Sequence, residues 1–115
     1  MAHGSRRDSA NQEFVELVKT IAETSPQFDQ VLPAFLEQAP PTLMQTCQTL
    51  IEDDIKKIYV YPLFFNNGRH VGKDIPAQVA EVMENFPAIE IELLDYFGTA
   101  PELASTVGNH ISNQL

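Results

Sequence analysis

Residues 58–65 have the sequence IYVYPLFF, an almost continuously apolar run that is followed by the polar, glycine-containing segment NNGRHVGKD. A strand of a parallel sheet has such a composition when both of its faces are covered, because neither face then meets water. We therefore predict a central parallel strand over residues 58–65. The polar segment, residues 66–74, is expected to be the loop at the carboxyl end of this strand.

Helical and strand patterns alternate on both sides of this run. Four segments show the apolar spacing of amphipathic helices, and two short apolar runs are typical of strands. The helices are expected at residues 9–24, 40–53, 75–86 and 103–111, and the strands at residues 31–36 and 89–94. Pro33 removes a ladder donor and therefore indicates an edge strand. The alternation predicts an α/β fold, an open parallel sheet flanked by helices on both faces.

The strand that should feed the first helix is reduced to Met1 and Ala2. In a doubly wound sheet the first strand lies centrally, so its loss would leave unpaired backbone on both sides. Two explanations are open. A start codon further upstream would add about five apolar residues, the usual length of a strand, or the sheet is completed by closing up or by a partner chain.

Length and composition indicate one globular domain, residues 1–115, with 43% hydrophobic residues. The formal net charge of −9 argues against a nucleic-acid partner. No apolar run is long enough to span a membrane, and no leader pattern is present, so a cytoplasmic location is expected. Cys47, the single cysteine, lies on the apolar face of its helix and is expected in the core.

The strand-to-helix loops of an open α/β sheet are where ligands bind. Here these loops hold His3, Glu37 and His70, and two imidazoles with a carboxylate suit a divalent ion such as cobalt, nickel, iron or zinc. The alternative is that the histidines are ordinary surface residues, as His110 is expected to be. No glycine-rich phosphate-binding motif is present, so no nucleotide cofactor is predicted.

Basic residues gather near two of the histidines. Arg6, Arg7, Arg69 and Lys73 are four of the seven lysines and arginines, and each lies within a few residues of His3 or His70. Chance placement is the alternative. A locally positive cleft would allow a chain of net negative charge to bind an anionic ligand.

Three segments of the chain resemble one known family. AHGSRRDSANQEF, AFLEQAPPTL and YVYPLFFNNGRHVGKDIP are similar to the signatures of the small CbiX-type chelatases, and the resemblance covers nearly the whole chain. It implies a chelatase-like α/β sheet and insertion of a divalent metal, cobalt first, into sirohydrochlorin without nucleotide hydrolysis, in cobalamin or sirohaem synthesis. It also implies a homodimer, in which two copies stand in for the two halves of longer chelatases.

The resemblance assigns roles to the candidate residues. His3 and His70 would be the paired metal-binding and catalytic histidines, and Glu37 would match the acidic residue of the family. Arg6 and Arg69, with Arg7 or Lys73 as further candidates, would pair with the carboxylates of the tetrapyrrole. The remaining predicted tetrapyrrole contacts are Phe65, Asn66, Asn67, Gly68 and Val71, together with Phe64, although an LFF run is also typical of a core.

Three alternatives stay open at this point. Iron or nickel could replace cobalt, because the ligand set does not separate these metals. A protein on the same scaffold could bind metal or tetrapyrrole without catalysing insertion. A truncated, inactive member of the family would also carry these motifs.

Overall fold

The computed structural model describes all residues from Met1 to Leu115. Its named sheet consists of two parallel strands, β1 (Lys57–Val60) and β2 (Glu90–Leu93), with Lys57 opposite Glu90 and Val60 opposite Leu93. β1 is shorter than the predicted strand 58–65. Beyond Val60 the chain continues to pair through single hydrogen bonds rather than a regular ladder.

The first residues of the chain extend this sheet. The α-amino group of Met1 donates to the carbonyl oxygen of Tyr61 at 2.7 Å, and the N–H of Leu63 donates to the carbonyl oxygen of Met1, also at 2.7 Å. The surroundings remove water from the Met1 amine, and this burial lowers its pKa to about 6. Met1 is therefore paired with the segment that follows β1.

The other side of the same stretch pairs with residues 34–37. The N–H of Ala2 donates to the carbonyl oxygen of Ala34 at 3.1 Å, and the N–H of Leu36 donates to the carbonyl oxygen of Ala2 at 2.8 Å. The predicted strand over 31–36 is thus limited to isolated parallel bridges of Phe35, one to Ala2 and one to Thr42. The sheet order is 34–37, 1–3, β1, β2, with residues 1–3 in the central position that the sequence predicted for the first strand.

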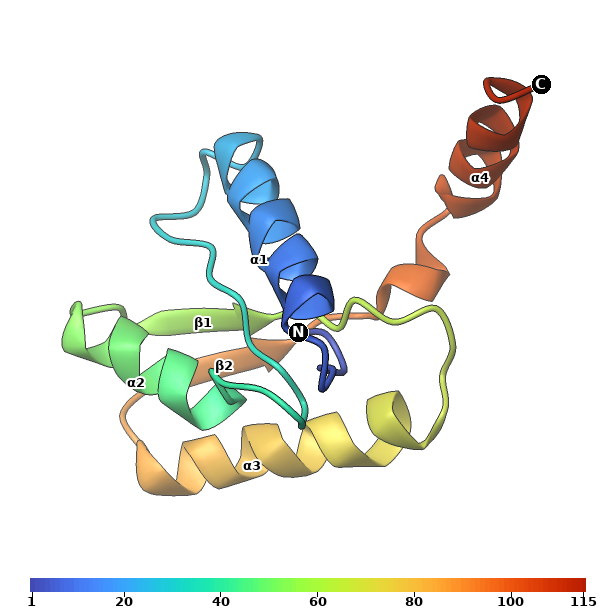
Figure 1. The fold of residues 1–115 in the computed structure, drawn as a ribbon. Coiled ribbons are helices and arrows are strands. Elements are labelled where there is room, and N and C mark those ends of the chain that lie inside the picture. The colour runs from blue at the N-terminus through green and yellow to red at the C-terminus, as the bar shows by residue number, and fades with distance from the viewer.

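Helices lie on both faces, as predicted (Figure 1). α1 (Asp8–Glu23) rises from one face, and α2 (Leu43–Glu52) and α3 (Ile75–Asn85) cover the other. Thr42 caps α2 by accepting from the Gln45 N–H, and the Gln45 side chain accepts from the Thr42 N–H in return. The closing helix is α4 (Leu103–Ser112).

The core lies between the sheet and the α2–α3 layer. Its nine buried residues come from the 34–36 segment, α2, β1 and α3: Ala34, Leu36, Leu43, Cys47, Ile58, Val60, Ile75, Val79 and Val82. Cys47 is 1% exposed, as expected of a core residue, and burial raises the pKa of its thiol to about 11. None of the helices has the length and apolar composition needed to cross a bilayer.

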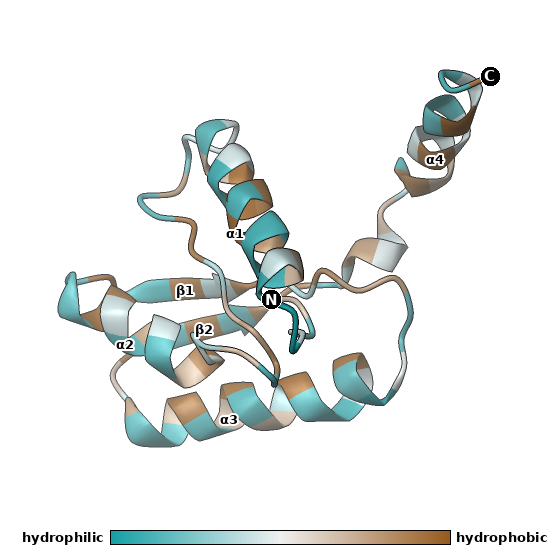
Figure 2. Cartoon of the chain, in the orientation of Figure 1, coloured by the Kyte–Doolittle hydropathy of each residue, from teal (hydrophilic) through white to brown (hydrophobic).

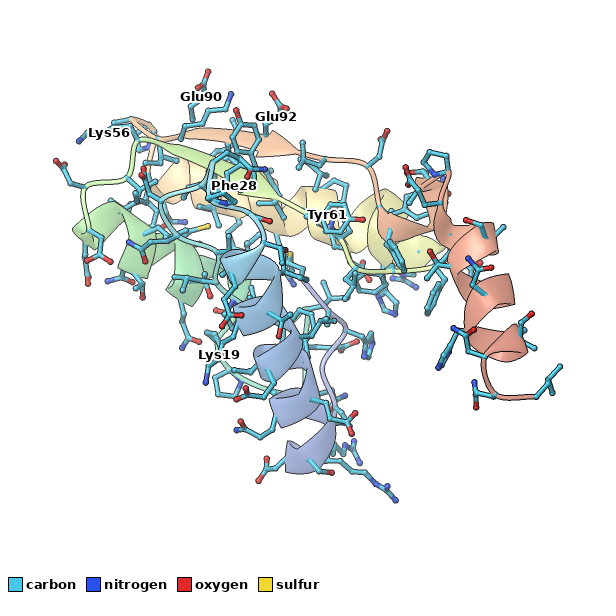
Figure 3. All side chains as sticks on the ribbon, turned by 90° about the horizontal axis from the view of Figure 1, so that it is seen from above. Lys19, Phe28, Lys56, Tyr61, Glu90 and Glu92 are labelled. Atoms are coloured by element: carbon cyan, nitrogen blue, oxygen red, sulfur yellow. The ribbon has the colours of Figure 1, made fainter.

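The opposite face of the sheet is only partly covered, so the prediction that residues 58–65 are buried on both faces is wrong. Ile58 and Val60 are buried, but Tyr59 is 45% and Tyr61 40% exposed. Figure 3 looks onto this face, where Phe28 and Tyr61 are labelled. Phe28 covers part of it, with its ring centroid 5.9 Å from that of Tyr59. The open area arises because α1 covers only part of this face.

α4 does not cover this open face either. It follows a short 3₁₀ turn at Phe97–Thr99 and projects away from the rest of the molecule (Figure 1). Apolar and polar residues alternate along it (Figure 2), and Val107 and Ile111 are about half exposed. The radius of gyration is 15.0 Å, against about 13 Å for a compact chain of this length. Thus α4 forms where predicted but lies off the sheet.

A substitution at Gly4 tests how closely the backbone after His3 packs against Glu37. Its φ of +96° is rarely adopted by other residues, and a Cβ there would lie 1.8 Å from the Glu37 carbonyl oxygen. Gly4→Ala should lower the free energy of unfolding by about 2–3 kcal/mol, measured by urea denaturation. Gly108→Ala is the control, since a Cβ there meets nothing within 4 Å and should stabilise α4 by about 0.5–1 kcal/mol. Equal effects of the two variants would contradict this packing.

Candidate functional site

Three predicted site residues converge at the carboxyl ends of the strands. His3 follows the short first strand, Glu37 follows the 34–36 segment, and His70 lies beyond β1. One ligand atom from each lies within 4.8 Å of the others. The rings of His3 and His70 are 4.8 Å apart between centroids and meet edge to face at 66°. The expected juxtaposition of two imidazoles and a carboxylate is therefore present.

His3 is held at both ring nitrogens. Nδ1 lies 2.9 Å from the Gly4 carbonyl oxygen, which can only accept, so Nδ1 carries a proton. Nε2 lies 2.9 Å from Glu37 Oε1, and both side chains are nearly half exposed. This contact shares a proton between imidazole and carboxylate. A divalent cation can replace that proton, because both atoms are metal ligands once deprotonated.

The backbone fixes Glu37 opposite His3. The Glu37 N–H donates to the His3 carbonyl oxygen at 3.0 Å. Gln38, the next residue, has φ of +72°, which is uncommon for a residue other than glycine. Such conformations are costly and concentrate at functional sites. The Gln38 side chain also accepts a hydrogen bond from Arg6 Nε at 3.3 Å, which places the Arg6 side chain beside the site.

The segment that holds His70 is helical, so the prediction of a loop over residues 66–74 is wrong for its second half. His70–Asp74 forms one π-helical turn, closed by a hydrogen bond from the Ile75 N–H to the His70 carbonyl oxygen, and leads directly into α3. Wide turns of this kind are frequent at functional sites. The turn brings Asp74 Oδ2 within 2.8 Å of His70 Nδ1.

Asp74 is the site residue that sequence reasoning missed. The spacing of four residues between His70 and Asp74 is the signal that could have found it, since such pairs meet on a helix. That signal was hidden because the segment is polar and glycine-containing, and therefore resembles a loop.

A hollow of about 350 Å³ lies against the two histidines. Its lining consists of His3, Leu63, Phe64, Phe65, Asn66, Gly68, His70 and Val71. Phe65, Asn66, Gly68 and Val71, four of the predicted tetrapyrrole contacts, line this hollow, whereas Asn67 is not part of the lining. Phe65 is 67% exposed, so it is not a core residue. Phe64 packs against the core cluster, which agrees with the alternative considered for this run.

The four predicted cationic residues are all exposed. The Arg69 side chain is 80% exposed, and its Nε lies 4.0 Å from Asp74 Oδ1. Arg6, Arg7 and Lys73 are exposed and form no ion pair. Cations that remain solvated in this way are free to meet an anionic ligand.

The fold and the site define a class of protein. An open parallel α/β sheet presents two histidines and a carboxylate at the carboxyl ends of its strands, a set of donor atoms that suits a divalent transition metal. The CbiX family model matches residues 1–114. The chain belongs to the CbiX family, as the sequence motifs indicated.

Its curated relatives are named as chelatases. The chain is 30% identical over 113 residues to the chloroplastic sirohydrochlorin ferrochelatase of Arabidopsis thaliana. This alignment covers 98% of the chain and 50% of that protein. The chain is 33% identical over 76 residues to the sirohydrochlorin cobaltochelatase of Methanopyrus kandleri, covering 66% of this chain and 52% of that one. The chain spans about half the length of these relatives.

Solved structures confirm the fold. The CbiX protein of Marinobacter aquaeolei VT8 superposes with a TM-score of 0.86 at 25% identity, covering 98% of this chain and 91% of that one. The sirohydrochlorin chelatase SirB from Bacillus subtilis subspecies spizizenii, solved in complex with cobalt, superposes with a TM-score of 0.82 at 24% identity. That match covers 97% of this chain and 47% of SirB. The predicted chelatase-like sheet is therefore present.

Proposed function

We propose that this chain is one chelatase domain, residues 1–115, which inserts a divalent metal into sirohydrochlorin without a nucleotide. The observation that carries the proposal is the convergence of His3, Glu37 and His70 within 4.8 Å beside an open hollow. The names of the relatives supply the substrate, since both ferrochelatases and cobaltochelatases of sirohydrochlorin are among them. The pathway would be cobalamin or sirohaem synthesis.

Metal insertion needs groups that hold a cation loosely and also accept protons. Two pyrrole N–H protons must leave the macrocycle as the metal enters, and histidine can serve as ligand and base near neutral pH. His3 and Glu37 would hold the metal substrate in place of the proton that they share. His70 faces the same point and would ligate the ion or take a pyrrole proton.

We propose cobalt as the metal substrate, with iron as the alternative. Imidazole and carboxylate ligands suit both ions, but sites of this kind generally bind Co²⁺ more tightly than Fe²⁺. Nickel fits the same donors and belongs in the same comparison. Turnover measured with each ion separately, under anaerobic conditions for iron, decides among them.

Replacing His70 tests the assignment of the site. His70→Ala should abolish metal insertion while leaving the far-ultraviolet circular dichroism unchanged, because the side chain is 41% exposed and lies outside the core. The measurement is the absorbance change when protein, sirohydrochlorin and Co²⁺ are mixed. His110→Ala, on the projecting α4, is the matched control and should turn over like the unchanged protein. Normal turnover by His70→Ala would contradict the proposal.

The exposed cations near the site support an anionic substrate. We propose that Arg6 and Arg69, with Arg7 or Lys73 as further candidates, pair with sirohydrochlorin carboxylates. Charge reversal at Arg69 should weaken substrate binding at least tenfold at low ionic strength, with a smaller effect in high salt. Fluorescence titration of metal-free sirohydrochlorin measures this affinity. Lys56→Glu is the control, because Lys56 lies at the opposite end of β1 and pairs with Asp54. Equal affinities for the two variants would argue against the assignment.

We propose that two copies of the chain form a homodimer. α4 projects with Val107 and Ile111 exposed and uncovered by the rest of the chain. A mainly apolar hollow of about 570 Å³ is lined by α1, residues 25–34, α2 and β1. The occupant we propose for the hollow is α4 of the second copy, since the chain is about half as long as its relatives and two copies would restore their length.

Charges on the apolar face of α4 test this dimer. Val107→Glu combined with Ile111→Glu should convert a dimer to a monomer, because buried carboxylates without partners are costly. Light scattering coupled to gel filtration measures the mass. Ser105→Glu with Asn109→Glu adds the same charge to other positions of α4 and should remain dimeric. A monomeric unchanged protein at all concentrations would refute the dimer.

A non-catalytic carrier of metal or tetrapyrrole, or an inactive family member, would show binding without insertion in the same absorbance assay. A cytoplasmic location also stays a prediction. The Arabidopsis relative is chloroplastic by name, which shows that the family is not confined to one compartment.

A further inference from the structure

We infer that Asp74 is a positioning residue, which fixes the proton of His70 on Nδ1 and leaves the lone pair of the neutral ring on Nε2. The inference rests on the proposed function for its consequence in metal insertion, but the arrangement of the His70 ring can be measured without it. The contact that carries it is the 2.8 Å distance between His70 Nδ1 and Asp74 Oδ2.

The chemistry of the pair decides which nitrogen carries the proton. An ionised carboxylate can only accept, so His70 Nδ1 must donate to it. In the neutral ring Nε2 then has the free lone pair. Asp74 is about one third exposed, and the π turn that begins at His70 ends at Asp74, so backbone and side chain restrict the same ring.

The two histidines of the site are therefore supported differently. His3 Nδ1 donates to a backbone carbonyl, which is neutral, whereas His70 Nδ1 donates to a carboxylate. A carboxylate behind a histidine increases the electron density on the opposite nitrogen, and loss of such a partner typically reduces metal affinity 10–100-fold. His70 is thus the ligand or base whose strength is set by a second residue. In contrast, the carboxylate of Glu37 contacts the other ring nitrogen of His3, Nε2, which is the proposed ligand atom.

The surroundings of Asp74 leave its charge available to His70. The nearest cation is Arg69, whose Nε lies 4.0 Å from the other carboxylate oxygen, Oδ1. Its guanidinium is largely in water, where such pairs contribute little. Lys73 precedes Asp74 in the chain and makes no ion pair with it. The short contact to His70 is the main interaction of Asp74.

Two substitutions separate the charge of Asp74 from its shape. Asp74→Asn keeps the size and one acceptor oxygen but removes the charge, and Asp74→Ala removes both. Asp95→Asn is the matched control, because Asp95 is an exposed carboxylate in the loop after β2 and has no hydrogen-bond or ion-pair partner. Thermal unfolding of all three variants shows that they fold.

The first readout is the tautomer of His70 in metal-free protein, from long-range ¹H–¹⁵N correlation spectra in alkaline buffer, where imidazoles are neutral. The unchanged protein should show the Nδ1–H form alone. Asp74→Ala should show a substantial Nε2–H population, which a merely structural role of Asp74 would not produce. A pure Nδ1–H form in Asp74→Ala, or an Nε2–H form in the unchanged protein, would overturn the inference.

The second readout is the affinity for Co²⁺ alone, by calorimetry. Asp74→Asn and Asp74→Ala should bind 10–100-fold more weakly, and Asp95→Asn should bind like the unchanged protein. Unaltered affinity in both Asp74 variants would also overturn the inference. If the unchanged protein fails to insert metal, the proposed function fails, while the tautomer of His70 still decides the role of Asp74.

Discussion

The pairing of the first three residues with backbone on both sides is the interaction on which the rest of the structure depends. Met1 bonds to the segment after β1, and Ala2 and His3 bond to residues 34–37. Without this stretch the two neighbouring segments would face each other across unpaired donors and acceptors, each costly when buried. Both backbone groups of Met1 and of Ala2, and the carbonyl oxygen of His3, take part in this pairing.

This pairing also builds the site. His3 and Glu37 lie at the end of the same bridge, joined by the hydrogen bond from the Glu37 N–H to the His3 carbonyl oxygen. Their side chains therefore leave neighbouring backbone positions in register and meet at 2.9 Å. Gly4 permits the close approach because a side chain there would strike the Glu37 carbonyl. Main-chain contacts therefore set the geometry of the proposed metal-binding group, and a bulky residue at position 4 would disturb it without touching the side chains of His3 or Glu37.

Local signals in the sequence predict the helices well and the strands less well. The helix bounds agree within a few residues because apolar spacing and caps such as Thr42 act over one turn. The strand over 31–36 reduces to isolated bridges at Phe35, one to Ala2 and one to Thr42. The stretch that holds Ala2 is only a few residues long, too short for a regular ladder. The candidates His3, Glu37 and His70 follow from their loops and from the motif. Asp74 does not, because its contact with His70 requires the π turn, and the single apolar residue of that turn, Val71, is too little to predict a helix.

Residues 58–65 are more exposed to solvent than their apolar composition predicts. An aliphatic and aromatic run predicts a strand covered on both faces, yet Tyr59 and Tyr61 are nearly half exposed and α4 lies off the sheet. Sequence composition reflects the surroundings in which a strand functions, and these can include a second chain. Tyrosine suits such a position because its ring is apolar while its hydroxyl tolerates water. A strand whose second face is covered only on association would have this composition, whereas one that always faced solvent would alternate apolar with polar residues.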